Sequence, residues 1–486
     1  MKLQQIAIEN YRSFAQGHVA DLDAVNVLAG PNAAGKSNLF AAIEGFFGFF
    51  ASTNIAYRAD AFAGQLDFHN AATATPITIT CTLDLGADTA NVLARLCRTA
   101  PHLAQYVETK VDTARLTVGL TTKTTETGEP FTYVARVELE TDRPYTLLHV
   151  PAATADALYA RTQEIAGISG EQRKLRRFLK RFDSDDWDMI KEAVKPEYAG
   201  RVRMSTHRII GRLLGAGSAE LTERLEQLVR DSDDFDTFVH AVQGIIDDLE
   251  GEKSNLAFRD IEGEVTSFAG PESVIPAFYN EIARTLGGVT VTHLRADRPG
   301  IGQQDADKLL QLKMQKDDAG HFRRLQRTAR DVLGVELDAF AAADADTRTA
   351  VDRVPARLDV DDIPVAAAGE GVHQGLRVVL DSDLSRPDIL LVETPERGLS
   401  PAVARRVAGF LAAQGEHAQV FATTQAPGVI DAAAPRHVHA VSKPAGTAPA
   451  GTAPSGTAPS GTAVETVDTR TASERLRADD PAVRGG

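Results

Sequence analysis

The stretch from Val25 to Phe40, VNVLAGPNAAGKSNLF, constrains the fold of this chain more than any other part of its sequence. A short apolar run leads into a turn that reads Gly30-x4-Gly35-Lys36-Ser37, and an apolar-periodic helix follows. This is the P-loop pattern in the strand–loop–helix context that it requires. Glycine lets the backbone N–H groups of the loop turn towards phosphate, and the helix N-terminus adds a favourable dipole. The sequence therefore predicts a site for a nucleoside triphosphate.

The side chains of this loop have different expected roles. Lys36 is expected to reach the β- and γ-phosphates, and the Ser37 hydroxyl is expected to ligate Mg²⁺. The other loop positions predicted to contact the nucleotide are Gly30, Asn32, Ala33, Ala34, Gly35 and Asn38. The predicted cofactors are accordingly ATP and Mg²⁺.

The bulk composition is that of an ordinary water-soluble protein. The chain has 486 residues, of which 43% are hydrophobic and 24% charged, and its formal net charge is −15. This negative charge argues against uniform attraction to nucleic acid, so any such contact needs a local basic patch. Two cysteines, no signal-peptide pattern and no 18-residue apolar run favour a cytoplasmic protein without a membrane span.

A family resemblance becomes specific at the N-terminus. The segment IENYRSF, followed by VLAGPNAAGKSNLFAAIE, resembles the start of the RecF/OLD-type ATPases, which are relatives of the structural-maintenance-of-chromosomes proteins. The resemblance implies an α/β fold, a P-loop NTPase of ABC-ATPase-head type with an antiparallel β subdomain. It also implies that Arg12 approaches the nucleotide. The alternative for Arg12 is a solvated arginine in a turn.

The rest of the chain is expected to form three parts. Residues 1–150 form the N-terminal part of the head, with antiparallel strands at 76–84 and 114–149. Residues 151–288 form a helical insertion without a sustained heptad repeat, and residues 289–486 complete the head. In the antiparallel subdomain the family often uses a glutamine to bridge Mg²⁺ and water, and Gln65 is the nearby candidate.

Basic residues gather at 172–182, QRKLRRFLKRF, where the apolar residues fall on one face of a helix. One interpretation is contact with nucleic-acid phosphates, and the other is a solvated amphipathic helix paired with the acidic segment that follows. A second basic run contains Arg323, Arg324, Arg327 and Arg330, with the same two interpretations. In HLRADRPG, either Arg295 or Arg298 could face the nucleotide or a partner, or form a structural pair.

The sequence Gly369-Glu370-Gly371 opens a helix and resembles the signature motif of ABC-type heads. In that family the signature of one subunit caps the γ-phosphate bound by the other, so the resemblance implies a homodimer with Gly369 and Gly371 at the nucleotide. Many relatives have serine between these glycines. Here the charge of Glu370 would oppose phosphate, so this residue points away or the signature engages ATP weakly.

The run from Asp388 to Glu393 has the Walker B layout, in which Glu393 is the expected acid of the metal shell. Relatives place a second acid directly after it, but this chain has Thr394, which is not a base. Glu396 is the nearest remaining carboxylate and the candidate substitute. Gln425 stands where relatives have a histidine that senses the γ-phosphate, and it cannot carry a proton. Lys36, Glu396 and Gln425 are the predicted catalytic residues, and slow hydrolysis is expected.

Near the C-terminus, residues 445–463 repeat a five-residue unit without core-forming side chains. We expect a disordered loop at 444–463 between strands at Val438–Val441 and Val464–Val467, then a helix at 471–478. No room remains for the Toprim nuclease domain of OLD proteins, so nuclease activity is not expected.

The family works on DNA in repair or phage defence, commonly with a separately encoded effector. The resemblance therefore implies that this chain is an ATPase in such a setting. The alternative is a hydrolysis-deficient, ATP-gated scaffold or nucleic-acid-binding module.

Overall fold

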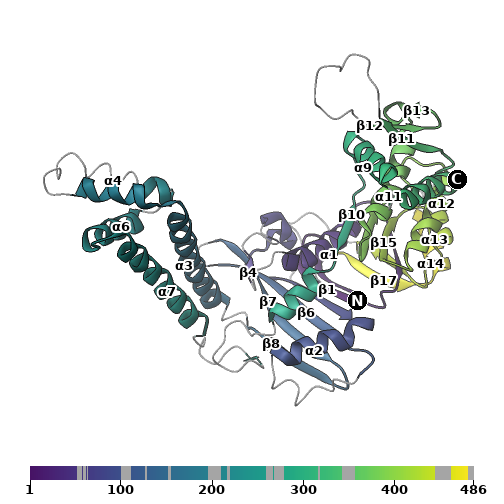
Figure 1. Ribbon diagram of the computed structural model, residues 1–486. Coiled ribbons are helices and arrows are strands. Elements are labelled where there is room, and N and C mark those ends of the chain that lie inside the picture. The colour runs from purple at the N-terminus through teal and green to yellow at the C-terminus, as the bar shows by residue number, and fades with distance from the viewer. Residues whose placement is uncertain are drawn as a thin grey trace. The chain divides into compact units, whose positions relative to one another are not determined.

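The computed structural model divides the chain into two compact units, which are Met1–Leu148 with Ala277–Gly486, and His149–Pro276 (Figure 1). The structure describes residues 1–51, 57–58, 62, 64–99, 111–125, 128–151, 155–194, 210–215, 219–258, 266–267, 279–315, 318–341, 356–443 and 461–479. No helix in these ranges is both long enough and apolar enough to cross a membrane.

A six-stranded sheet forms the centre of the first unit. Its strands, in spatial order, are β10 (Val291–Leu294), β14 (Ile389–Glu393), β15 (Gln419–Thr424), β3 (Val25–Ala29), β16 (Val438–Ser442) and β17 (Ala463–Val467). Neighbouring strands are parallel from β10 to β16, and β17 is antiparallel to β16. Every residue of β14 and β15 is buried, as expected for strands covered on both faces. Because the strands are parallel, the loops after β3, β14 and β15 meet at one edge.

Helices precede or follow these strands in the chain. They are α1 (Lys36–Ala51), α11 (Glu370–Ser385), α12 (Pro401–Gln414), α13 (Pro427–Ala433) and α14 (Thr469–Asp479). The start of α12 is fixed by Ser400, whose side chain caps the helix, and by Pro401 at its first position.

An antiparallel sheet forms the second layer of this unit. Within this unit its spatial order is β2-β1-β5-β6-β7-β8, and β4 (Tyr57–Arg58) pairs with β7. The bounds are β1 (Lys2–Tyr11), β2 (Phe14–Val19), β5 (Ile77–Asp84), β6 (Arg115–Thr124), β7 (Pro130–Glu140) and β8 (Pro144–His149). The two-residue strand β9 (Thr266–Ser267) belongs to the second unit. Buried residues alternate strictly along β5, which is the pattern of a strand with one covered face. The predicted antiparallel β subdomain is confirmed.

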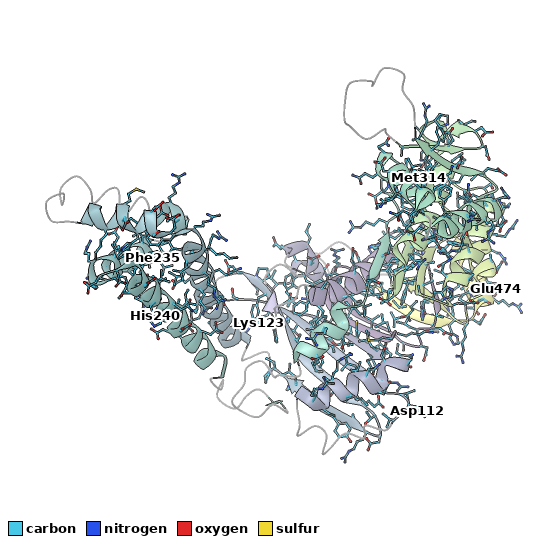
Figure 2. All side chains as sticks on the ribbon, viewed as in Figure 1. Asp112, Lys123, Phe235, His240, Met314 and Glu474 are labelled. Carbon is cyan, nitrogen blue, oxygen red and sulfur yellow. The ribbon has the colours of Figure 1, made fainter. Side chains whose placement is uncertain are left out.

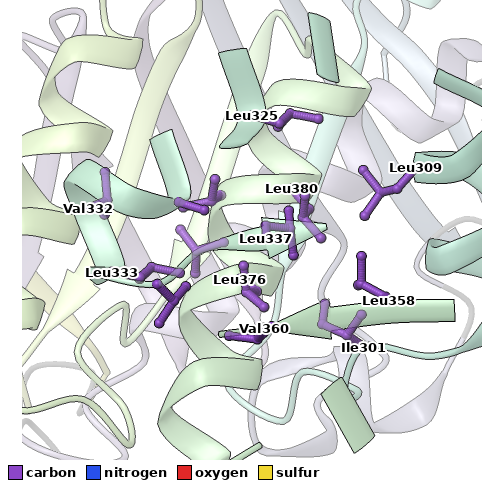
Figure 3. Close-up of a cluster of buried hydrophobic side chains, with 14 of the residues drawn as sticks. Ile301, Leu309, Leu325, Val332, Leu333, Leu337, Leu358, Val360, Leu376 and Leu380 are labelled. Atoms are coloured by element: carbon purple, nitrogen blue, oxygen red, sulfur yellow. The ribbon is translucent and has the colours of Figure 1, made fainter. Parts of the chain in front are cut away.

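A smaller sheet and several helices pack against α11. The sheet consists of β11 (Leu337–Ala341), β12 (Ala356–Val360) and β13 (Ile363–Pro364). The helices are α9 (Gln303–Met314), α10 (Ala319–Thr328) and a π-helical turn at Ala329–Leu333. Figure 3 shows Leu376 and Leu380 of α11 among the buried side chains of this core. At the end of α9, Met314 is 77% exposed (Figure 2).

The second unit is a helical cluster of α3 (Ala155–Arg181), α4 (Ser184–Val194), α6 (Ala219–Asp231) and α7 (Phe235–Phe258). Its mainly aliphatic core contains an aromatic cluster, in which the rings of Phe178 and Phe182 stack at 4.8 Å and Trp187 lies 5.3 Å from Phe238. Phe235, labelled in Figure 2, packs beside Phe182. The expected insertion ran to residue 288, whereas α8 (Tyr279–Gly287) packs against α1 and α2 (Thr89–Thr99) in the first unit.

The C-terminal hairpin has the predicted form. Strands β16 and β17 pair from Val438 with Val467 to Ser442 with Ala463, and α14 follows, so the expected strands and final helix are confirmed. Of the expected disordered loop, residues 444–460 lie outside the described part of the chain. The last three residues of the expected loop, 461–463, belong to the described part. For them the expectation of disorder is wrong, because Thr462 is 1% exposed and its side chain is hydrogen-bonded.

Candidate nucleotide-binding site

The loop between β3 and α1 has the backbone of an anion cradle. Two of its residues have a left-handed backbone, Ala33 with φ of +59° and Gly35 with φ of +107°. At Gly30 a Cβ atom would lie 2.1 Å from the carbonyl oxygen of Val441, so only glycine fits. Within the described ranges, the N–H groups of Gly35, Lys36 and Ser37 donate to no residue. These amides at the N-terminus of a 16-residue helix remain available for phosphate oxygens.

The Lys36 ammonium lies inside this loop. Its Nζ donates to the carbonyl oxygens of Gly30 and Pro31, both at 2.8 Å, and the residue is 8% exposed. Burial lowers the pKa of Lys36, and the negative charges of Glu396 and Glu393 act in the opposite direction. The Lys36 Nζ thus lies within the loop that is expected to bind the phosphates.

Glu393 and Ser37, the two residues expected to hold Mg²⁺, line the same cavity. Glu393 ends β14, and its carboxylate accepts a hydrogen bond of 3.0 Å from the Ala296 N–H. Burial would raise the pKa of Glu393, but hydrogen bonds with His293, Ser37 and Ala296 outweigh it and lower the pKa to about 2. An ionised carboxylate beside a serine hydroxyl is an oxygen donor set of the kind that Mg²⁺ takes in proteins. These two residues therefore fit the expected metal.

His293 is a member of the site that the sequence analysis missed. It lies on β10, where its Nδ1 is 2.9 Å from Oε2 of Glu44 and its Nε2 is 3.4 Å from Oε1 of Glu393. Burial opposes protonation of His293, but the neighbouring carboxylates of Glu393 and Glu44 raise its pKa. A sequence signal was present, because His293 opens the segment HLRADRPG, whose arginines were considered as residues that could face the nucleotide. Of these, Arg295 is mostly exposed and lies 3.6 Å from Glu44.

Arg12 reaches the same region from the antiparallel sheet. Its backbone is left-handed, with φ of +48°, and its Nε donates to Oδ1 of Asp67 at 2.8 Å. The backbone of Arg12 is also held, since its N–H donates to Asp67 O and its carbonyl contacts His69 Nδ1. Arg12 and Asp67 line a cavity of about 540 Å³ that Ser37 and Glu393 also line.

Asp67 lines this cavity, whereas Gln65, the glutamine that the family resemblance pointed to, does not. Gln65 lies in a short 3₁₀ turn at Gln65–Asp67. Sequence position alone could not decide between two polar residues in one turn, because their side chains point in different directions. The family's bridging glutamine therefore has no counterpart among the residues lining this cavity.

The predicted catalytic residues Glu396 and Gln425 lie together. Oε1 of Glu396 accepts a hydrogen bond from the Thr424 hydroxyl at 2.7 Å and from the Gln425 N–H at 3.2 Å. The Gln425 side chain in turn donates to Oδ1 of Asn32 in the P-loop. Thr394 has a left-handed backbone, with φ of +40°. The ends of β14 and β15 are thus joined to the P-loop by side-chain hydrogen bonds.

The residues of the signature motif lie at the start of α11. Gly369 is the N-cap of this helix, and Glu370 is exposed in its first turn. A Cβ at Gly371 would lie 2.5 Å from the carbonyl oxygen of Gly398, so the helix packs tightly on the turn after β14. No hydrogen bond joins either glycine to the P-loop in the described part of this chain. Neither glycine is among the residues that line the cavity beside the cradle.

Arg298 has a structural role, which was one of the alternatives expected for it. It is buried, and it donates to the carbonyl oxygens of Glu393 and Thr394, each at 2.9 Å. Its Nε also donates to Oε1 of Gln374 on α11 at 3.0 Å. This arginine therefore ties the end of β14 to the signature helix and does not face the cavity.

Residues 1–185 match the family model of an AAA ATPase domain. The chain has the fold of a P-loop NTPase. The match includes the P-loop, and the structure adds an antiparallel β subdomain and helices to the mainly parallel sheet. A search of curated proteins finds no match to the sequence.

Three solved structures are similar to this P-loop NTPase. The Smc head domain with an extended coiled coil bound to the C-terminal domain of ScpA, derived from Pyrococcus furiosus, is 11% identical, with a TM-score of 0.37 and 98% of each chain covered. The SmcHead bound to the C-winged helix domain of ScpA is 9% identical, with a TM-score of 0.40 and coverage of 97% of this chain and 100% of the other. The Smc head domain with a coiled coil and joint, from Pyrococcus yayanosii, is 11% identical, with a TM-score of 0.39 and coverage of 98% and 99%.

Proposed function

We propose that this P-loop NTPase is a Mg²⁺-dependent ATPase of the RecF/OLD type. The observation that carries the proposal is the cradle itself: Gly35, Lys36 and Ser37 present N–H groups without a described acceptor, and the Lys36 ammonium lies inside the same loop. Anionic oxygens of a triphosphate satisfy both sets of donors. In the adjoining cavity, Arg12 is the further cation positioned to meet the nucleotide.

The residues divide the chemistry between them. Ser37 and Glu393 would hold Mg²⁺, which when bound neutralises charge on the phosphate oxygens. The carboxylate of Glu396 accepts a proton from the water that attacks the γ-phosphorus, and the bond to the β–γ bridging oxygen breaks as ADP leaves. Gln425 orients this water or the γ-phosphate by hydrogen bonding, because an amide cannot accept a proton for transfer.

We also propose that ATP closes a homodimer in which Gly369 and Gly371 of one protomer cap the nucleotide of its partner. The exposed start of α11 supports this, since a helix N-terminus suits an anion. The resemblance supports a role in DNA repair or phage defence with a separately encoded effector. Cys81 and Cys97 are free thiols, which fits a reducing compartment, and we propose the cytoplasm.

Nucleotide titration tests the ATP site. A fluorescent ATP analogue is titrated into the wild type and Lys36→Ala in the presence of Mg²⁺, with Lys308→Ala as a control at an exposed lysine on α9. Wild type and Lys308→Ala are expected to bind alike, and Lys36→Ala is expected to lose at least about tenfold in affinity, as for removal of a charged hydrogen bond worth about 1.5–3 kcal/mol. Absent binding by wild type, or equal binding by Lys36→Ala, would overturn the proposal.

An ATP-gated scaffold with little turnover is the second candidate function. Thr394 supports it, because a hydroxyl stands where relatives have an acid and its backbone is left-handed. In this case the same dimer forms with ATP but reopens mainly by nucleotide release. Phosphate release by wild type, compared with Lys36→Ala, separates the two functions.

Nucleic-acid binding by the helical unit is a further candidate. In the basic run of α3, the apolar side chains are buried in the unit's core while most of the cations are exposed. The exposed cations are Arg173, Arg176, Arg177, Lys180 and Arg181. Arg176 is 65% exposed and forms a long ion pair of 4.0 Å with Glu250, so its charge remains accessible to phosphate.

A further inference from the structure

Thr462 connects the C-terminal hairpin to the P-loop. It follows the repetitive segment and directly precedes β17, and it is 1% exposed. Its hydroxyl donates a hydrogen bond of 2.8 Å to the carbonyl oxygen of Ala34, which lies 428 residues earlier in the chain. The Thr462 N–H also donates to the carbonyl oxygen of Ser13 at 2.8 Å. One residue therefore joins the β1–β2 turn, the P-loop and the hairpin.

The hydrogen bond to Ala34 has a consequence for the next amide. A trans peptide is planar, so the C=O of Ala34 and the N–H of Gly35 point in opposite directions. When the Thr462 hydroxyl holds the carbonyl oxygen, it also sets the direction of the Gly35 N–H. This N–H is one of the donors without a described acceptor in the cradle.

Thr462 and Ser13 also fill the space beside the Cα atom of Gly35. A Cβ at this position would lie 2.4 Å from the Thr462 hydroxyl oxygen and 2.5 Å from that of Ser13. Ser13 Oγ in turn accepts a hydrogen bond of 2.8 Å from the Asn38 side chain in α1. Gly461 lies against the backbone of Ala15, where a Cβ would be 2.6 Å from the Ala15 nitrogen. The left-handed turn at Gly35 is thus enclosed by residues from both ends of the chain.

We propose that Thr462 is a positioning residue of the nucleotide site, whose hydroxyl fixes the Ala34–Gly35 peptide so that the Gly35 N–H faces the phosphates. The inference rests on the proposed function, because it assumes that the cradle binds a triphosphate. Without the hydroxyl, the Ala34 carbonyl oxygen is buried without its partner, and the peptide can rotate to find another. The expected effect is weaker binding of ATP and of ADP alike, since both carry the phosphates that a P-loop cradles.

The test compares variants that differ by one hydroxyl. Thr462→Val keeps the shape of threonine, and Thr462→Ala and Thr462→Ser form a pair that differs only in the hydroxyl. Thr466→Val makes the same change on an exposed residue of β17, whose hydroxyl lies 3.3 Å from Nδ1 of His439. For each protein, the Kd for fluorescent ATP and ADP is measured, together with Tm without nucleotide and the rise in Tm on adding Mg-ATP.

We expect Thr462→Val and Thr462→Ala to lose about three- to tenfold in affinity for both nucleotides, the size of one net hydrogen bond. Thr462→Ser regains most of the affinity, and Thr466→Val matches wild type. The positioning role is overturned if Thr462→Val and Thr462→Ala bind with wild-type affinity. It is also overturned if Thr462→Ala and Thr462→Ser lose affinity equally. Either result leaves the proposal of ATP binding intact. If Thr462→Val does not fold, the Ala–Ser pair decides. If wild type itself binds no nucleotide, the proposed function fails and this inference fails with it.

Discussion

The Thr424 hydroxyl donates a hydrogen bond of 2.7 Å to Oε1 of Glu396, which joins the end of β15 to the turn after β14. The Gln425 N–H donates to the same oxygen, whereas Oε2 is buried and has no partner among the described residues. One oxygen of this carboxylate is therefore held in place by Thr424 and Gln425. The other retains the capacity to accept a proton, which is what a general base needs.

Replacing Glu396 by Gln is expected to lower steady-state phosphate release by about 10²-fold or more, the usual contribution of a general base. The amide keeps the hydrogen bond with Thr424 but cannot take up the proton, so the Kd for ATP should change little. Glu416→Gln, at an exposed glutamate after α12, is the matched control. Equal turnover in Glu396→Gln and wild type would show that another group accepts the proton.

Closure of the homodimer is predicted to depend on Gly371. A Cβ at this position would lie 2.5 Å from the Gly398 carbonyl oxygen, so Gly371→Ala must displace the start of α11 from the turn after β14. We expect Mg-ATP to double the mass of Glu396→Gln protein in light scattering, and the added Gly371→Ala change to reduce that dimer fraction strongly.

Gly409 on α12 provides the control for that experiment. Its Cβ would meet nothing within 4 Å, so Gly409→Ala should leave dimerisation unchanged and stabilise the helix by up to about 1 kcal/mol. If the Glu396→Gln protein that retains Gly371 stays monomeric at saturating ATP, the proposed dimer is contradicted. Equal dimer fractions with and without the Gly371→Ala change would contradict the role of the signature helix.

The sequence alone was sufficient to predict the parts of the fold whose signal lies in neighbouring residues. The P-loop pattern carries its own strand, turn and helix, and the alternation along Ile77–Asp84 and in β6 and β7 identifies strands by periodicity alone. The motifs after β14 and β15 could be located because parallel strands bring their carboxyl ends to one edge. These parts of the fold depend on neighbours in the chain or on one general rule of sheet geometry.

The missed residues act through contacts between distant segments. His293 contacts Glu44 across 249 residues, and Thr462 contacts Ala34 across 428. Nothing in the local pattern around Thr462 separates it from the threonines of the preceding repeats, because its burial depends on the β1–β2 turn. Asp67 is similar: its partner Arg12 lies at the β1–β2 turn, so its direction follows from the register of the antiparallel sheet.

Binding of nucleic acid by α3 should depend steeply on salt. If its exposed cations contact phosphates, Arg173→Gln, Arg176→Gln and Arg177→Gln together should weaken binding of a labelled duplex. The slope of log K against log salt should also fall by about one for each phosphate that the triple variant leaves unneutralised. Arg470→Gln, at an exposed arginine of α14, should change neither quantity. Absent binding, or the same slope in the triple variant, would leave α3 as a solvated face of the helical unit.

The last prediction concerns acid stability and His439. This residue of β16 is 1% exposed, and burial, assisted by the charge of His437, lowers its pKa to about 4. In the unfolded chain a histidine has a pKa of about 6.5, so the unfolded state takes up the proton first as the pH falls. Stability is therefore full above pH 6.5 and is lost progressively between pH 6.5 and 4, where the folded state begins to accept the proton.

Between pH 7.5 and 4.5 this difference amounts to roughly 2–3 kcal/mol of unfolding free energy, since one pKa unit corresponds to about 1.4 kcal/mol. Denaturant unfolding should show that His439→Asn loses less stability over this range than wild type by about that amount. His417→Asn, at an exposed histidine, should follow the wild-type profile. Parallel profiles for wild type and His439→Asn would mean that His439 is protonated as readily in the folded sheet as in the unfolded chain, and that its burial beside β3 does not exclude the charge.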